Sequence, residues 1–214
     1  MVMPVFAGWP NVLLPPQAKE KPPLAEKIFM NGVPLKVVNF STRLTVRQVL
    51  GYYRSRWADG FVEDEYNGWQ QISRLQGKYF VTVQAKPSEL AEHDVATRGR
   101  INIMNLNEGD IRTTPNFPVL QGSAVINDVE TVDKYNKART LLIVNNYPAE
   151  KNAEYYQRYF KKEKWTQVTN KTVGDSAHVL VFKRDEDETS VVIRSSSGDS
   201  SILVNEVKKK SWFN

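Results

Sequence analysis

The feature of this sequence that most constrains its fold is a pattern that occurs twice. Val38-Asn39 and Val144-Asn145 each precede, after a short polar gap, a stretch with helical spacing. Each stretch carries two tyrosines followed by another large aromatic residue: Tyr52, Tyr53 and Trp57 in the first, and Tyr155, Tyr156 and Phe160 in the second. A period of roughly one hundred residues is too long for a solenoid and predicts an internal duplication of one small domain.

The expected fold class is α+β, with two tandem ββαβββ-like units, each formed by one helix packed on an antiparallel sheet. Thr45 and Gln48 have the spacing of a capping box, which predicts the start of the first helix. Pro148 suits the first position of the second helix, because its missing N–H would be unpaired there anyway. Asn31-Gly32 lies between two β-rich runs and predicts a hairpin.

Changes in composition along the chain indicate six segments. A proline-rich stretch without periodicity precedes the first unit, and a second stretch with proline and glycine separates the two units. The expected segments are residues 1–7, a candidate signal-peptide remnant; 8–26, a Pro-rich extended arm; 27–107, the first ββαβββ unit; 108–121, a linker; 122–207, the second ββαβββ unit; and 208–214, a basic and aromatic tail.

The N-terminal residues suggest export. Residues 1–7 are apolar, and the Val5-x-Ala7 ending before Gly8 fits the small-residue rule for signal peptidase cleavage. The stub lacks a basic region, so an ordinary terminus is an equal alternative. The sequence has no cysteine, which is compatible with periplasm or cytosol. A periplasmic or secreted location is expected, with the cytoplasm as the alternative, and no stretch approaches the roughly 18 apolar residues of a membrane span.

The charge distribution disfavours a dedicated nucleic-acid domain. The formal net charge is +5, but residues 1–132 hold 14 basic and 13 acidic groups and are nearly neutral. Three of the excess positive charges come from Lys208, Lys209 and Lys210 alone. Nucleic-acid domains concentrate positive charge on one face. Nucleic-acid binding is therefore the least favoured of the classes considered.

Catalytic and metal-binding motifs are not evident. His93 and His178 are the only histidines and lack a partner at zinc-motif spacing. The acidic runs at 63–65 and 185–188 indicate structural roles: the first follows the first helix and its turn, and the second is typical of the charged tip of a hairpin. The second run also lacks the glycine of a calcium loop. The sequence therefore predicts a non-enzymatic protein with no cofactor and no metal.

The first helix supplies the candidate binding site. Arg43, Arg47 and Arg54 occur in a segment without acidic residues, and Gly51 leaves a notch beside two of them. Arg47 and Arg54 lie about 20° apart on a helical wheel, so both guanidinium groups can reach one carboxylate or phosphate. The alternative is a solvated helix flank. The candidate site residues are thus Arg47, Gly51, Arg54 and Arg43.

These observations lead to one functional hypothesis and two alternatives. We expect a non-enzymatic accessory or adaptor protein of a cell-envelope assembly, which acts through protein–protein interaction with a partner that has an acidic surface. The first alternative is a module that binds a small anionic or amphipathic ligand near Arg47 and Arg54. The second is a nucleic-acid-binding protein. The oligomeric state is left open.

Overall fold

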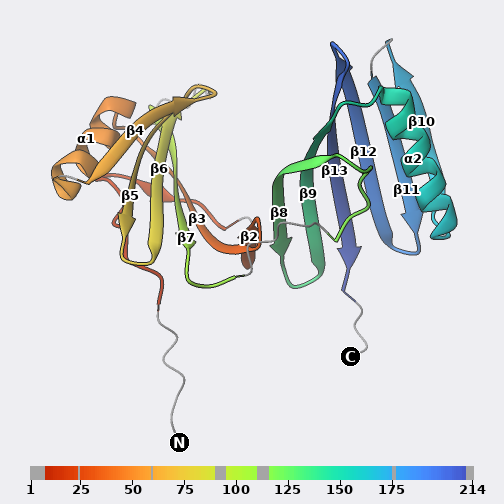
Figure 1. The fold of residues 1–214 in the computed structure, drawn as a ribbon. Coiled ribbons are helices and arrows are strands. Elements are labelled where there is room, and N and C mark those ends of the chain that lie inside the picture. Colours follow the sequence, from red (N-terminus) through yellow and green to blue (C-terminus); the bar gives the residue numbers. More distant parts are fainter. Residues whose placement is uncertain are drawn as a thin grey trace, which may run out of the picture. The chain divides into compact units, whose positions relative to one another are not determined.

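A computed structural model describes residues 8–23, 25–58, 60–89, 95–109, 116–174 and 177–210. These residues form thirteen β-strands and two α-helices, and they divide into two compact units (Figure 1). Unit 1 contains the described residues up to 23 together with 33–109, and unit 2 contains 25–32 and the described residues from 116 onward.

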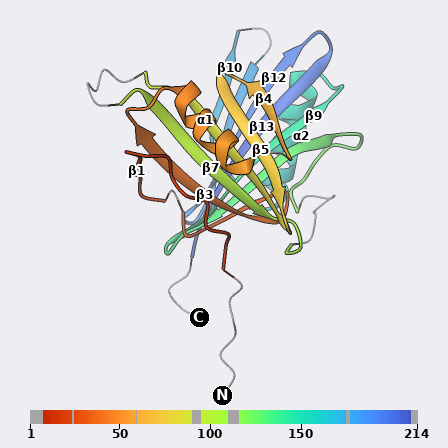
Figure 2. The same cartoon turned by 90° about the vertical axis from the view of Figure 1, so that its left-hand side faces the viewer.

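Unit 1 is an antiparallel sheet with one helix on one face. The sheet has the order β3-β7-β6-β5-β4, and β1 pairs with β3. Figure 2 shows α1 lying across the strands of this sheet. The elements are β1 (Lys19–Glu20), β3 (Val33–Thr42), α1 (Val46–Trp57), β4 (Phe61–Tyr66), β5 (Trp69–Gln76), β6 (Tyr79–Pro87) and β7 (Thr97–Asn105).

The core of unit 1 lies between α1 and the sheet. Tyr53 is 1% exposed and packs over a sheet surface built of β-branched residues. Phe40 faces Gly99 across the β3–β7 pair, and a Cβ atom at residue 99 would lie 2.1 Å from the Phe40 ring. Glycine is therefore required at that position. The other core residues are Val49, Leu50, Ile72, Val81, Val83, Ala85, Ile101 and Ile103.

The proline-rich arm completes the core of its own unit. Val12, Leu14 and Ala18 pack against the cluster beneath α1. The hydroxyl of Tyr53 donates a hydrogen bond of 2.9 Å to the carbonyl oxygen of Leu13. The described part of the arm is thus an integral part of unit 1.

Unit 2 is a seven-stranded antiparallel sheet with α2 on one face. Its order is β10-β11-β12-β13-β9-β8-β2. The elements are β2 (Lys27–Met30), β8 (Ala124–Val132), β9 (Asn136–Asn145), α2 (Ala149–Lys162), β10 (Thr166–Val173), β11 (Ala177–Arg184), β12 (Asp187–Ser196) and β13 (Asp199–Lys209).

Aromatic rings dominate the core of unit 2. Phe160 of α2 stacks on Phe182 of β11 with ring centroids 4.4 Å apart, and Tyr156 is 1% exposed. Phe117, from the segment expected to be a linker, is also buried against these rings. The hydroxyl of Tyr155 donates to the carbonyl oxygen of Val119 at 3.1 Å. The end of the linker segment therefore belongs to the core of unit 2.

The prediction of an α+β protein made of two tandem ββαβββ units, with an internal duplication, is wrong. The described residues are mostly antiparallel β-sheet, with thirteen strands and only two helices. In unit 1, four strands follow α1, one more than the ββαβββ pattern has. The missed strand in unit 1 is β4, which contains the acidic run at 63–65 that the sequence pattern assigns to no strand. Its hairpin turn is Asn67-Gly68, where both residues have positive φ, 51° and 72°.

Several local predictions are confirmed. Asn31 and Gly32 both adopt positive φ, as the Asn-Gly turn requires. Neither helix in the described part of the chain has the length and apolar character of a membrane span, in line with the sequence. Residues 1–7, His93 and residues 211–214 of the tail lie outside the described residues, so the signal-remnant prediction is not addressed by the structure.

Replacing Tyr53 or Tyr156 by alanine should each lower the free energy of unfolding by about 3 kcal/mol, because a fully buried ring is lost. Tyr53→Phe should cost about 1 kcal/mol, since it removes only the hydrogen bond to Leu13. Urea denaturation of the three variants checks this. Losses below about 1 kcal/mol for both alanine variants would show that the rings are not core.

Candidate functional site

The arginine-bearing helix begins as the sequence predicts. The hydroxyl oxygen of Thr45 accepts a hydrogen bond from the backbone N–H of Gln48, and the side-chain oxygen of Gln48 accepts one from the N–H of Thr45. This capping box fixes the first turn of α1 and thereby the orientation of Arg47 within it. Arg47 is exposed to solvent.

Arg54 is already paired within the chain. Its Nε and Nη2 atoms donate to the two carboxylate oxygens of Glu63 on β4, the second at 3.2 Å. This hydrogen bond to Glu63 raises the pKa of Arg54. The carboxylate expected from a partner is thus supplied by β4, the strand that the sequence analysis missed. A Cβ atom at Gly51 would meet no atom within 4 Å, so the surface beside this glycine is open.

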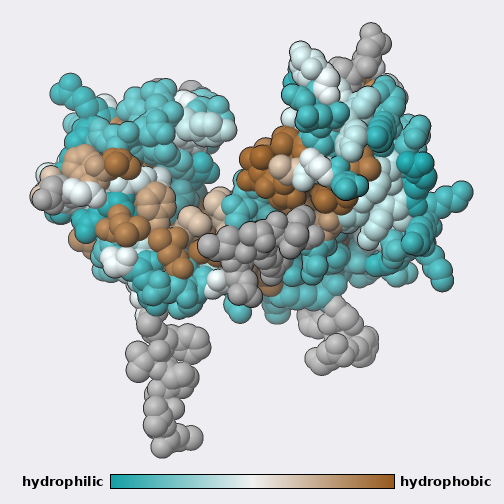
Figure 3. Space-filling view, viewed as in Figure 1, coloured by the Kyte–Doolittle hydropathy of each residue, from teal (hydrophilic) through white to brown (hydrophobic). Residues whose placement is uncertain are grey.

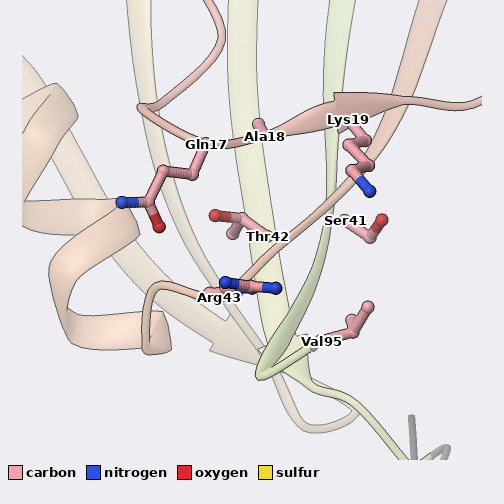
Figure 4. Close-up of a pocket in the computed structure, with 7 residues that line it drawn as sticks. All are labelled: Gln17, Ala18, Lys19, Ser41, Thr42, Arg43 and Val95. Carbon is pink, nitrogen blue, oxygen red and sulfur yellow. The ribbon is translucent and has the colours of Figure 1, made fainter. Parts of the chain in front are cut away.

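Arg43 precedes α1 and lines a separate depression. This depression, of about 340 Å³, lies between β1, the end of β3 and the start of β7 (Figure 4). Lys19 and Arg43 bring two cations to it, and Ser41 brings a hydroxyl group. The remaining lining residues are Gln17, Ala18, Thr42 and Val95. Arg47, Gly51 and Arg54 are not among the lining residues, so the four candidates do not share one depression.

The face of the unit 1 sheet opposite α1 carries a polar network that the sequence analysis did not identify. Gln84 on β6 donates to Gln71 at 2.7 Å, and its oxygen accepts from Arg100 and Asn102. The guanidinium of Arg100 also lies 4.6 Å from the centre of the Trp69 ring. Burial lowers the pKa of Arg100. These polar residues occupy alternate positions of neighbouring strands and therefore lie on one face of the sheet. The network could have been predicted only if the pairing register of the strands had been known.

A buried charge cluster lies on the helix-bearing face of unit 2. Arg139 on β9 forms a bidentate pair with Asp128 on β8, with distances of 2.8 and 2.7 Å. Glu130 and Glu206 are the direct cross-strand neighbours of Arg139. Hydrogen bonding to Asp128 raises the pKa of Arg139, and burial raises the pKa of Glu206. The guanidinium group of Arg139 therefore interacts electrostatically with three carboxylates, those of Asp128, Glu130 and Glu206.

This cluster is best explained as part of the fold. The fork between Arg139 and Asp128 satisfies both groups, and Lys137 contacts Glu130 at 2.9 Å. Among the described residues, no group of three or more His, Cys, Asp and Glu side chains is arranged to hold a metal ion. The signal in the sequence was the presence of charged residues at alternate positions of two apolar strands.

Comparison with known proteins gives no relative. No family model, no curated protein and no solved structure matches this chain.

Breaking the Arg54 pair should affect stability little. Both side chains are more than one-third exposed, so Arg54→Ala and Glu63→Gln should each lower the free energy of unfolding by less than about 1 kcal/mol. Arg47→Ala serves as the control and should change it less still. A double-mutant cycle between Arg54 and Glu63 measures the coupling. A coupling well above about 1 kcal/mol would mean that this pair is a structural clamp.

Glu206 should make unit 2 sensitive to pH. Its pKa in the folded state lies above the ordinary value of 4.5, so the folded state binds the proton more tightly than the unfolded state. Stability is therefore lost as the pH rises through 4.5 to the raised pKa. Glu206→Gln should abolish this loss, and exposed Glu154→Gln should not. Urea denaturation across this pH range checks it, and parallel pH profiles for wild type and Glu206→Gln would contradict it.

Proposed function

We propose that this protein is a non-enzymatic accessory or adaptor protein of a cell-envelope assembly and that it acts through protein–protein interaction. The observation that supports this most is an apolar row on the face of unit 2 opposite α2. Leu180, Val191 and Ile202 point toward α2 and are fully buried. Because side chains alternate along a strand, their neighbours point to the opposite face.

These neighbours form a continuous row across four strands. Val179 pairs with Val192, Val192 with Leu203, and Leu203 with Leu142. Leu203, near the middle of the row, is 41% exposed. Polar residues flank the row on both sides: Thr140 and Asn205, joined by a hydrogen bond of 2.9 Å, on one side, and Ser201 and Arg194 on the other. An apolar centre with a polar rim is the composition of a protein interface.

Further exposed apolar residues support a macromolecular partner. Figure 3 shows hydrophobic surface on both units. Exposed side chains include Val62, Tyr66 and Leu75 in unit 1, and Ile126, Val168, Val173 and Val207 in unit 2. Clustered exposed apolar groups mark interaction surfaces. The location in the envelope rests on the Val5-x-Ala7 pattern, which precedes the described residues.

A second candidate function rests on the depression in Figure 4. Lys19, Arg43 and the Ser41 hydroxyl are suited to a small anionic ligand. Such a ligand would be recognised in unit 1 and would leave the apolar row of unit 2 unoccupied. Titration with inorganic phosphate, followed by the backbone amide signals of Ser41 and Arg43, separates this function from the adaptor function.

A photocrosslinking amino acid at position 203 should capture a protein partner in cells, because Leu203 lies at the centre of the proposed interface. The same substitution at Leu106 on unit 1, which is also exposed and lies outside the apolar surfaces named above, is the matched control. Cross-linked products from envelope fractions are identified by mass spectrometry, and circular dichroism verifies folding. Identical products at the two positions, or cross-links to nucleic acid alone, would contradict the proposal.

A further inference from the structure

Strand β10 presents an unpaired edge. It is the end strand of the unit 2 sheet, and among the described residues only β11 pairs with it. Seven of its eight residues are exposed. Every second N–H and C=O group of an end strand points away from its neighbour, so this edge offers a row of hydrogen-bonding groups to solvent.

The end strand of unit 1, β4, differs from β10 because it carries acidic residues. Strand β4 carries Glu63, Asp64 and Glu65 in succession, and adjacent charges on an edge repel an incoming strand. Strand β10 has no acidic residue and one cation, Lys171. A bulge at Val168 interrupts its first part, but Thr169–Val173 stays in regular register with β11. The edge of β10 therefore lacks the charge protection that β4 has.

A groove runs beside this edge on the α2 side. Its volume is about 370 Å³, and it lies at the start of the edge, where it is lined by residues of α2, by Trp165 just before β10, by Gln167 of β10 and by Phe182 of β11. Trp165 and Phe182 give it an aromatic wall, and Arg158 and Lys161 give it two cations. The side chain of Arg158 is 73% exposed, and its contact with Glu154, at 4.0 Å, is a weak ion pair. Gln157 and Gln167 complete the lining.

We propose that β10 and this groove bind an extended acidic segment of a partner protein, which adds to the sheet as a further strand. Main-chain hydrogen bonds to Thr169–Val173 supply the affinity. Side chains of the added strand alternate between the two faces. Carboxylates on one face meet Arg158 and Lys161, and those on the other meet Lys171.

Charge complementarity determines the chemistry of the occupant. The three cations lie on both sides of the strand edge, with Lys171 opposite Val179 on the face away from α2. Arg158 has Glu154 at 4.0 Å, so Lys161 on one face and Lys171 on the other are the cations that would repel a basic segment and attract an acidic one. This inference rests on the adaptor function proposed above and specifies one of its partners.

A synthetic copy of residues 61–66 serves as the probe, because this acidic segment forms a strand in the protein itself. The peptide carries a fluorescent label, and its binding to the full chain is followed by anisotropy. A version with lysine at the three acidic positions tests charge. A version with alternate backbone nitrogens methylated tests main-chain hydrogen bonding with the side chains unchanged.

The expected result is binding of the acidic peptide that weakens with rising salt, no binding of the lysine version, and loss of binding on methylation. Hydrogen exchange of the amides of Thr169–Val173 should slow when the acidic peptide is bound. Lys161→Glu should weaken binding by about fivefold, because its charge faces the groove. Lys162→Glu is the matched control, since it is adjacent, exposed and not part of the groove lining, and it should have a smaller effect.

Three outcomes would overturn the inference. Equal effects of the two lysine variants would exclude the groove, and binding that survives methylation would exclude strand addition. Self-association of the protein in sedimentation, abolished by Lys161→Glu, would identify a second copy as the occupant instead. Failure of the peptide with retained cross-links at position 203 would refute this site and leave the adaptor function standing.

Discussion

The packing of one aromatic helix face on one face of a sheet organises each unit. Tyr53 in unit 1, and Tyr156 and Phe160 in unit 2, are almost fully removed from solvent, and burial of large rings is the largest favourable contribution that a short helix can make. α1 and α2 have 12 and 14 residues, lengths at which an isolated helix is marginal in water. The helices therefore depend on the sheets, and each sheet depends on its helix to cover an apolar face.

This arrangement leaves the opposite sheet face available. In unit 1 that face is occupied by side-chain hydrogen bonds among Gln71, Gln84 and Asn102, and in unit 2 by the apolar row through Leu203. The two units thus present different chemistry on the side away from the helix. A partner surface that is complementary to the polar face of unit 1 is not complementary to the apolar face of unit 2, so the two faces are suited to different partners.

Local signals in the sequence predicted local structure well. The capping box at Thr45 and the Asn-Gly turn at residue 31 depend on neighbours within a few residues, and the structure has both. The predicted fold class was wrong because antiparallel sheet, with thirteen strands, dominates the described residues far more than the ββαβββ pattern allowed. Strand β4 is one example: its three acidic residues have low strand propensity, and the Asn67-Gly68 turn is the only local signal of its hairpin. The pairing of Arg54 with Glu63 was not predicted for the same reason, since Glu63 comes from that strand. The Arg139 cluster requires strand registers that one sequence does not contain.

The order of strands has a consequence for how each unit reaches its native state. Strand β3 precedes α1 in the chain but pairs with β7, the last strand of unit 1, and β9 likewise pairs with β13. In each unit, the strand just before the helix therefore pairs with the last strand of the unit, across a long intervening stretch of chain. Such non-local pairing raises contact order and slows folding. During synthesis on the ribosome, β9 can pair with β8 early, but its other edge stays unpaired until β13 emerges, so this last strand completes the sheet of unit 2.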